Sequence, residues 1–291
     1  MNKEVLKKIG IYAGILLLFI ALAYSYTPQV LEGKIVNQSD IASWKGMANE
    51  AITHNKANPD DPTAWTNSMF GGMPTTATID SFEGDWTDYI YDFLLTGRRP
   101  ASYLLIALIG GFLLMLSLGT SKTIAVAGAI AIAFCSYNMQ IIQVGHNTKM
   151  QAIAYFPWVL AGVIFTYRAA LRSFAAAQDD NRKWLPKTIL GATLFAFALS
   201  MQIKANHLQI TYYLAIVIFA YAIGLFIYLC IDKARRSEGL KRFFAASALL
   251  LVIGIVGIAT NANKLIPTYE YTPYTMRGGS ELSADSEHQA E

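Results

Sequence analysis

Seven apolar segments, each close to the length of a membrane-spanning helix, limit what this chain can fold into. The hydrocarbon core of a bilayer is about 30 Å thick, so a helix needs about 20 apolar residues to cross it. The segments are residues 8–26, 100–119, 122–142, 150–168, 187–204, 210–231 and 241–260. Only 15% of the residues are charged, against about 25% in a soluble domain. The sequence therefore predicts an all-α polytopic membrane protein with about seven transmembrane helices.

Lysine and arginine are concentrated at alternate ends of these segments. They precede the first segment and recur in the loops 168–187 and 232–242. Cytoplasmic loops carry an excess of both residue types, and alternation from a cytoplasmic N-terminus puts both loops inside. The basic residues are Lys3, Lys7, Lys8, Arg168, Arg172, Arg182, Lys183, Lys187, Lys233, Arg235, Arg236, Lys241 and Arg242. No small-residue cleavage site follows the first segment, so we expect an uncleaved helix.

Charge and hydropathy divide the chain into four parts. Residues 1–26 are the cytoplasmic N-terminus and first transmembrane helix, 27–99 a large outer loop, 100–260 a six-helix membrane bundle, and 261–291 an outer segment. The loop holds ten acidic residues against five basic ones, which suits an external segment, and its length favours a functional one. Apolar residues recur at helical spacing from Trp86 to Leu95, which predicts an interfacial helix.

Asp40, shortly after the first segment, is the first candidate for chemistry on the outer side. A carboxylate at the mouth of a helix bundle can bind a divalent cation or accept a proton from an attacking hydroxyl. The alternative is structural, because Ser39-Asp40 also fits a helix start, where an N-cap contributes about 1 kcal/mol. Taken alone, the short motif favours the cap.

Two outer turns strengthen the functional hypothesis: Gly145-His146-Asn147-Thr148-Lys149 and Lys204-Ala205-Asn206-His207-Leu208-Gln209. One such turn is best explained by solvation. Two, together with Asp40, predict a single outward-facing site, because polar groups at membrane depth are costly and usually functional. Lysine suits a phosphate as a point charge, and neutral histidine suits proton transfer. Metal ligation by either histidine is disfavoured, since no HxxxH or HxE spacing accompanies it.

The candidate residues fall into two groups. Asp40, His146 and His207 are the catalytic candidates, and Asp40 is also the candidate metal ligand. Arg98 and Arg99 either grip a lipid phosphate or extend to lipid headgroups. The candidates for binding substrate or phosphate are Lys149, Lys204, Arg98, Arg99, Asn147, Asn206 and Gln209.

Four stretches resemble the Bacteroidetes branch of the YfhO-like bacterial membrane proteins. They are Gln38–Ile41, Trp65–Pro74, Gly145–Lys149 and Pro267–Gly279. The resemblance runs from the first helix to about Leu282, and the stretch Trp65–Pro74 is its most specific part. The family is similar to type C glycosyltransferases, which have many spans, a large first outer loop and an active site on the outer face.

The resemblance implies an enzyme of the bacterial inner membrane. Such enzymes move a sugar from a polyprenyl-phosphate carrier to an acceptor, here a glycan or lipid of the cell envelope. Asp40 matches by position the acidic residue that they use as a base or metal ligand, with Mg²⁺ or Mn²⁺ as the candidate cofactor. Family members are longer, which implies that residues 261–291 begin further helices or an outer domain.

Two other classes of protein compete with the glycosyltransferase. A flippase or transporter of lipid carriers or polysaccharides would show broken helices at the midplane and inverted repeats, and the sequence shows no convincing repeat. A membrane scaffold would leave the two Lys-Asn-His turns unexplained. The expected partners are membrane lipids, the lipid-linked donor and the acceptor. The net charge of +3 comes from the inner loops, and nothing in the chain indicates a nucleic-acid surface.

Overall fold

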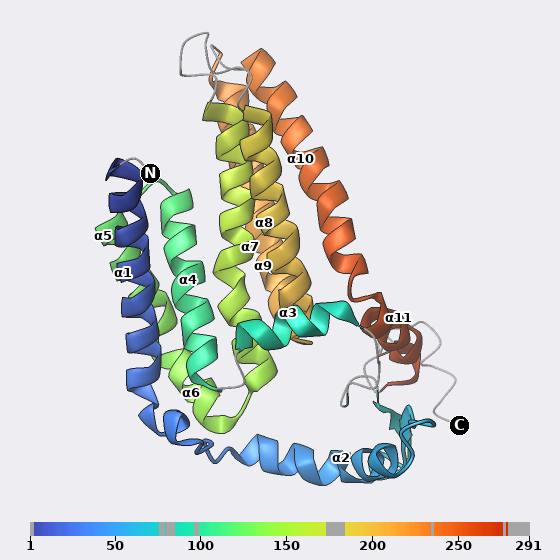
Figure 1. Ribbon diagram of the computed structural model, residues 1–291. Helices are drawn as coiled ribbons and strands as arrows, with labels where there is room; N and C mark the ends of the chain where they lie inside the picture. Colours follow the sequence, from blue (N-terminus) through green and yellow to red (C-terminus); the bar gives the residue numbers. More distant parts are fainter. Residues whose placement is uncertain are drawn as a thin grey trace. The chain divides into compact units, whose positions relative to one another are not determined.

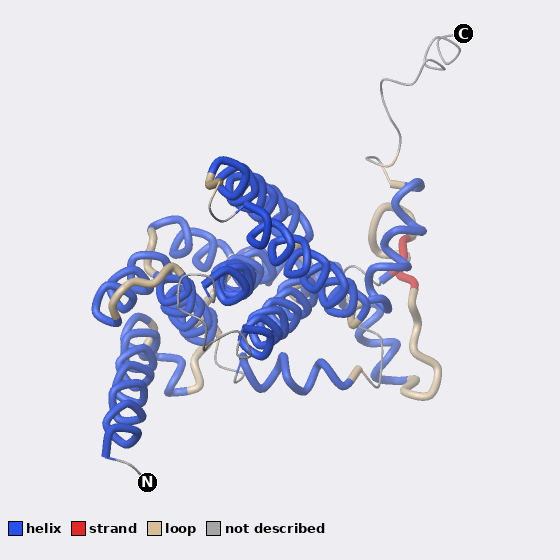
Figure 2. The backbone as a smooth tube through the Cα atoms, turned by 90° about the horizontal axis from the view of Figure 1, so that it is seen from above, coloured by secondary structure: helices blue, strands red, loops and turns tan. Residues whose placement is uncertain are grey.

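Helices dominate the part of the chain that the computed structural model describes, residues 3–75, 79, 85–95, 99–172, 184–233, 236–275 and 278 (Figure 2). Two short strands pair there as an antiparallel hairpin. The chain divides into two compact units, Met1–Asp40 with Trp86–Thr260, and Ile41–Asp85 with Asn261–Glu291. The all-α class predicted from the sequence is confirmed.

The first unit is a bundle of apolar helices that run side by side (Figure 1). The helix α7 is its centre, because α7 packs against α4, α8, α9 and α10. The elements of this unit are α1 (Lys3–Tyr26), η1 (Pro28–Glu32), the first two residues of α2 (Ser39–Ala57), α3 (Trp86–Leu95), α4 (Ala101–Ser117), α5 (Lys122–Ala133), α6 (Ser136–Val144), α7 (Asn147–Arg172), α8 (Trp184–Lys204), α9 (Leu208–Ile231) and α10 (Arg236–Ala259).

The contact between α7 and α8 is unusually close because glycines occupy it on both sides. A Cβ atom on Gly162 of α7 would lie 2.6 Å from the backbone nitrogen of Phe195. A Cβ atom on Gly191 of α8 would lie 2.8 Å from the backbone nitrogen of Thr166. Small residues of this kind let transmembrane helices approach each other without a hydrophobic driving force.

Six segments of the described chain are long and apolar enough to cross a membrane. They are Lys3–Tyr26, Lys122–Val144, Asn147–Leu171, Trp184–Lys204, Leu208–Ile231 and Arg236–Ala259. The predicted span 100–119 is the shorter apolar helix α4, whose 17 residues extend about 25 Å at 1.5 Å per residue. Large apolar side chains are exposed along the spans, for example Leu17 at 66% and Phe219 at 68%, as on a lipid-facing surface. The protein is a multi-pass helical membrane protein.

The third predicted span, 122–142, is not one helix. It breaks between α5 and α6, at Phe134 and Cys135. The side chain of Asn138 donates from Nδ2 to the backbone oxygens of Ile132 at 3.0 Å and Ala133 at 3.1 Å. Asn138 is buried, so it satisfies carbonyl groups that a helix break would otherwise leave unpaired in the membrane.

The basic residues lie at one end of this bundle, and the two turns that carry the candidate site residues lie at the other end. The start of α1, the end of α7 and the starts of α8 and α10 lie at one end (Figure 1). Basic side chains there bind helix ends: Arg168 donates to Ser117 O at 2.5 Å, and Arg242 donates to Ala170 O at 3.3 Å. The turn between α6 and α7 and the turn between α8 and α9 lie at the other end.

The second unit contains the rest of α2, β1 (Trp65–Thr66), β2 (Met73–Pro74), α11 (Ala262–Tyr271) and η3 (Thr272–Tyr274). Glu50 of α2 holds the turn after β1. Its Oε2 accepts hydrogen bonds from Thr66 Oγ1 at 2.6 Å and from the backbone nitrogens of Asn67 and Ser68, both at 2.9 Å. The hydrogen bond from Thr66, with those from the turn's N–H groups, lowers the pKa of Glu50. This carboxylate therefore has a structural role.

Candidate functional site

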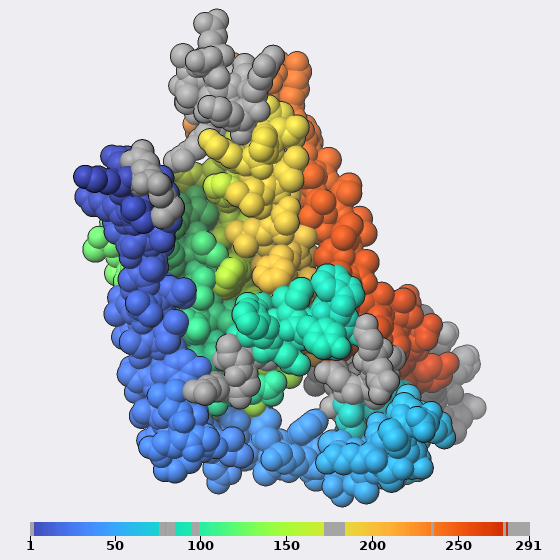
Figure 3. All heavy atoms as spheres, in the orientation of Figure 1, coloured from blue at the N-terminus to red at the C-terminus, as the bar shows by residue number. Residues whose placement is uncertain are grey.

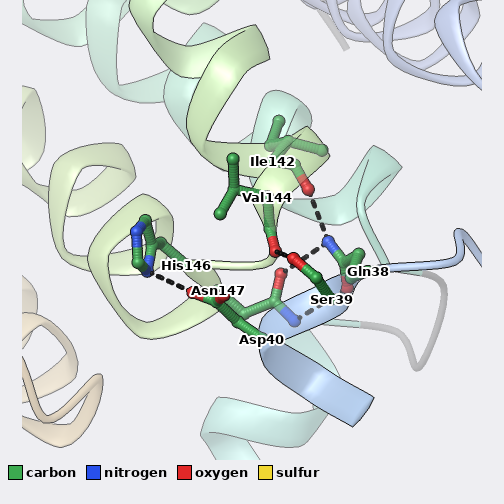
Figure 4. A network of polar contacts seen from close by, with 7 residues as sticks. All are labelled: Gln38, Ser39, Asp40, Ile142, Val144, His146 and Asn147. Atoms are coloured by element: carbon green, nitrogen blue, oxygen red, sulfur yellow. Dashed lines mark hydrogen bonds and ion pairs between the residues drawn. The ribbon is translucent and has the colours of Figure 1, made fainter. Parts of the chain in front are cut away.

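The first turn of α2 is fastened to the turn between α6 and α7 by side-chain contacts (Figure 4). Gln38 and Asn147 exchange amide hydrogen bonds of 3.3 and 3.2 Å. Gln38 Nε2 also donates to Ile142 O at 2.5 Å, and Ser39 Oγ donates to Val144 O at 3.4 Å. These contacts place the next residue, Asp40, beside the same turn.

Gly145 makes the geometry of that turn possible. It ends α6 with a φ of 105°, a left-handed conformation that residues with a side chain rarely adopt. The backbone nitrogens of Gly145 and His146 both donate to Ile141 O, at 3.1 and 3.0 Å. The chain then enters α7 at Asn147, so that the side chains of His146 and Asn147 both meet the start of α2.

Asp40 and His146 form a carboxylate–imidazole pair at the centre of this contact. Asp40 Oδ2 lies 2.9 Å from His146 Nδ1, and the two side chains are 41% and 52% exposed. Within the described residues, the Asp40 carboxylate contacts His146 and does not cap α2. An exposed pair contributes at most about 1 kcal/mol to stability. The pair is accessible to a ligand, and a carboxylate that orients an imidazole is a common arrangement for proton transfer.

A second cluster joins the end of α8 to α3. Lys204 Nζ lies 2.6 Å from Asp88 Oδ1 and donates to Thr87 Oγ1 at 2.8 Å. The Lys204 side chain is only 1% exposed, whereas that of Asp88 is 44% exposed. A buried ammonium group needs such a partner because desolvation of a charge is costly. α3 lies across the ends of the helices coloured yellow in Figure 3.

His207, in the turn after α8, is close enough to the turn before α7 for charges there to affect its pKa. Burial lowers the pKa of His207, and repulsion by Lys149 and by the protonated form of His146 lowers it further, while a backbone hydrogen bond opposes the shift. Apolar packing joins the same segments, since Ala152, Ala205 and Ile210 belong to one buried cluster. The two predicted turns are therefore neighbours, and His207 is held neutral beside them.

The remaining candidates have other positions. Lys149 lies over the ring of Tyr137, 5.2 Å from its centroid. Asn206 takes a left-handed conformation with a φ of 58° in the turn, and Gln209 donates to Tyr213 OH at 2.7 Å. Arg99 is exposed just before α4. Arg98 lies outside the described residues.

A divalent cation would find few protein ligands at Asp40. Among the described residues, no group of three or more His, Cys, Asp or Glu side chains could hold a metal ion. Asp40 and His146 together offer one carboxylate and one imidazole. Mg²⁺ commonly binds one or two carboxylates and takes its other ligands from water and substrate phosphate. Asp40 supplies one such carboxylate, so the divalent cation implied by the resemblance stays a prediction, and we assign no step to it.

Sequence reasoning assigned no role to Asp88, Thr87 or Gln38. A buried lysine at the end of a span does predict an acidic partner. The loop 27–99 contains ten acidic residues, however, and their spacing does not select one of them as the partner. Comparisons with protein-family models, with curated proteins and with solved structures found no match for this chain.

Proposed function

We propose that the protein is a membrane glycosyltransferase that moves a sugar from a polyprenyl-phosphate carrier to an acceptor on the outer face of the bacterial cytoplasmic membrane. The Asp40–His146 pair is the observation that carries this proposal. It is an accessible acid–base pair at the end of an apolar bundle, with the cations Lys149 and Lys204 at the same end. The resemblance of the motifs around Asp40 and His146 to YfhO-like proteins supports the same conclusion.

The pair supplies the proton transfer of such a reaction. The acceptor oxygen forms a bond to the anomeric carbon, while the bond from that carbon to the carrier phosphate breaks and the phosphate keeps the electron pair. With Nδ1–H of His146 donating to Asp40 Oδ2, Nε2 of the same ring can take the hydroxyl proton. The Asp40 charge then stabilises the imidazolium that forms. This tautomer is the one that the 2.9 Å contact favours.

Cations at the same end favour departure of the carrier phosphate. Negative charge develops on that phosphate as the glycosidic bond breaks, so a nearby ammonium group stabilises the transition state more than the ground state. Lys149 is half-buried against Tyr137, and its charge acts on His207. His207, neutral because its pKa is lowered, can orient the acceptor or the phosphate without adding repulsion for Lys149.

A transporter of lipid carriers is the second candidate, and the break between α5 and α6 is the observation that favours it. Broken helices near the bilayer midplane form the binding sites of many transporters, and Phe134 and Cys135 lie near the middle of the span Lys122–Val144. The carbonyls of Ile132 and Ala133 at this break are occupied by Asn138. These two carbonyls are therefore not available to bind a substrate. The transferase remains the better-supported function.

One assay separates the two candidates. The full-length protein is reconstituted in vesicles with polyprenyl phosphates that carry radiolabelled sugars and with a cell-envelope extract as acceptor. The transferase predicts that label leaves the lipid and appears in the acceptor. Movement of intact labelled lipid between leaflets, with no label in the acceptor, would instead establish the transporter.

A further inference from the structure

The helix α3 has two chemically different faces. Thr87 is buried, and Ile90, Tyr91 and Leu94 pack against the core of the first unit. On the opposite face, Trp86, Tyr89 and Phe93 are 64%, 79% and 78% exposed. These aromatic residues follow helical spacing and form one stripe, which we call the aromatic stripe of α3.

The contact with Lys204 indicates the depth at which this stripe would lie in a bilayer. Lys204 is the last residue of the span Trp184–Lys204, and it holds α3 through Asp88 and Thr87. α3 therefore lies at the level where a membrane-spanning helix ends. Trp and Tyr are enriched at this level because their rings are apolar and their N–H and O–H groups remain hydrated. The headgroup layer of the lipid is thus the surface that the aromatic stripe fits.

The two partners of the ion pair that holds α3, Lys204 and Asp88, differ in their exposure to solvent. Lys204 is enclosed, so its ammonium group requires an anion, whereas Asp88 is nearly half exposed and already partly hydrated. Asp88 can leave the pair at small desolvation cost, whereas the enclosed ammonium group of Lys204 is stabilised by an anion that takes the place of Asp88. A phosphate group carries more charge and more acceptor oxygens than a carboxylate and is a suitable replacement for it.

We propose that α3 is a lid in the headgroup layer, closed by the Lys204–Asp88 pair and opened when the phosphate of a membrane lipid takes the place of Asp88. The aromatic stripe keeps the released helix in the interface, next to the arriving lipid. The proposal shares the lipid phosphate with the proposed function but does not require sugar transfer. A binding measurement therefore tests it separately from the transfer assay.

The test uses a nitroxide label on Tyr89→Cys, with Cys135 and Cys230 replaced by alanine, in bilayer nanodiscs of phosphatidylcholine. Tyr89 is exposed, so the label does not disturb the pair. Accessibility to oxygen and to a water-soluble relaxation agent should place the label at headgroup depth. Phosphatidic acid should raise the ratio of mobile to immobile label about tenfold, as expected when a ligand prefers one of two states. Soluble inorganic phosphate should have little effect.

Variants assign the response to the pair. Asp88→Asn should release α3 in phosphatidylcholine alone, whereas Asp92→Asn, an exposed aspartate on the same helix, should not. Lys204→Gln should abolish the response to phosphatidic acid. The proposal is overturned if the label lies in bulk water, if phosphatidic acid leaves it immobile, if soluble phosphate acts equally well, or if Lys204→Gln still responds. The comparison of phosphatidylcholine with phosphatidic acid uses neither variant. It therefore tests the proposal even if Asp88→Asn fails to fold.

Discussion

The carboxylate of Asp40 lies 2.9 Å from Nδ1 of His146, although one residue begins α2 and the other precedes α7. The amide exchange between Gln38 and Asn147 fixes this approach. If the pair acts as one unit, its members should not contribute independently. We expect Asp40→Asn and His146→Gln each to reduce sugar transfer ~10²-fold or more, the scale for losing a general base. The double variant should be little worse than either. Multiplicative losses, measured as initial rates, would contradict a shared role.

His207 gives the site a pH dependence. Its pKa is lowered in the folded protein, so the unfolded chain binds a proton at a higher pH than the folded one does. The stability contribution of neutral His207 is therefore present above the ordinary histidine pKa and is lost as the pH falls below it. Thermal unfolding in detergent should show this loss for the wild type, and a smaller loss for His207→Gln.

Lys149 contributes to the lowered pKa of His207 through its positive charge. Lys149→Gln should therefore raise the pKa of His207 toward its usual value, because the repulsion between the two cations is removed. Titration of ¹³C-labelled histidines by NMR measures the shift, and Lys45→Gln on α2 is the control. An unchanged His207 titration in Lys149→Gln would show that the two turns are not close enough for Lys149 to affect the pKa of His207.

Asn138 should be needed for stability. Asn138→Ala leaves two backbone carbonyls at the break between α5 and α6 without their side-chain donor. The expected loss is about 1–3 kcal/mol, the cost of a buried polar group that is left unsatisfied. Gln140→Ala, at an exposed position of the same helix α6, should cost much less. Equal unfolding free energies for the two variants would show that Asn138 does not support the break.

We expect the basic end of the bundle to lie in the cytoplasm. In a protein without native cysteines, a membrane-impermeant reagent should label Asn58→Cys in intact cells and should spare Lys233→Cys until the cells are opened. The reason is that loops rich in Lys and Arg stay in the cytoplasm. The reverse labelling pattern would place the Asp40–His146 pair inside the cell and would remove the basis for an outer active site.

Hydropathy predicted the spans well because the length of an apolar helix is dictated by the bilayer. It did not reveal the break at Phe134 and Cys135, since both halves of that span are apolar and the device that stabilises the break is a single asparagine. The turns at 145–149 and 204–209 were found from their polar residues. Asp40 was predicted as their neighbour. Asp88 was not predicted as the partner of Lys204, because it reaches Lys204 only through tertiary packing. Of the pair Lys204–Asp88, Lys204 was therefore predicted from the sequence, and Asp88 was identified only from the fold.

Sugar transfer by Asp40→Asn is the measurement that tests the central claim most directly. Asparagine keeps the shape of the side chain and its ability to accept a hydrogen bond from His146, but it removes the charge. It also caps a helix about as well as aspartate does. The matched control is Glu32→Gln, which removes an exposed acid of the same loop that pairs with Lys34. We expect Asp40→Asn to express normally and to lose ~10²-fold or more of the transfer rate, while Glu32→Gln stays near the wild-type rate. Full activity of Asp40→Asn would show that Asp40 is structural and that the pair with His146 does not catalyse the reaction.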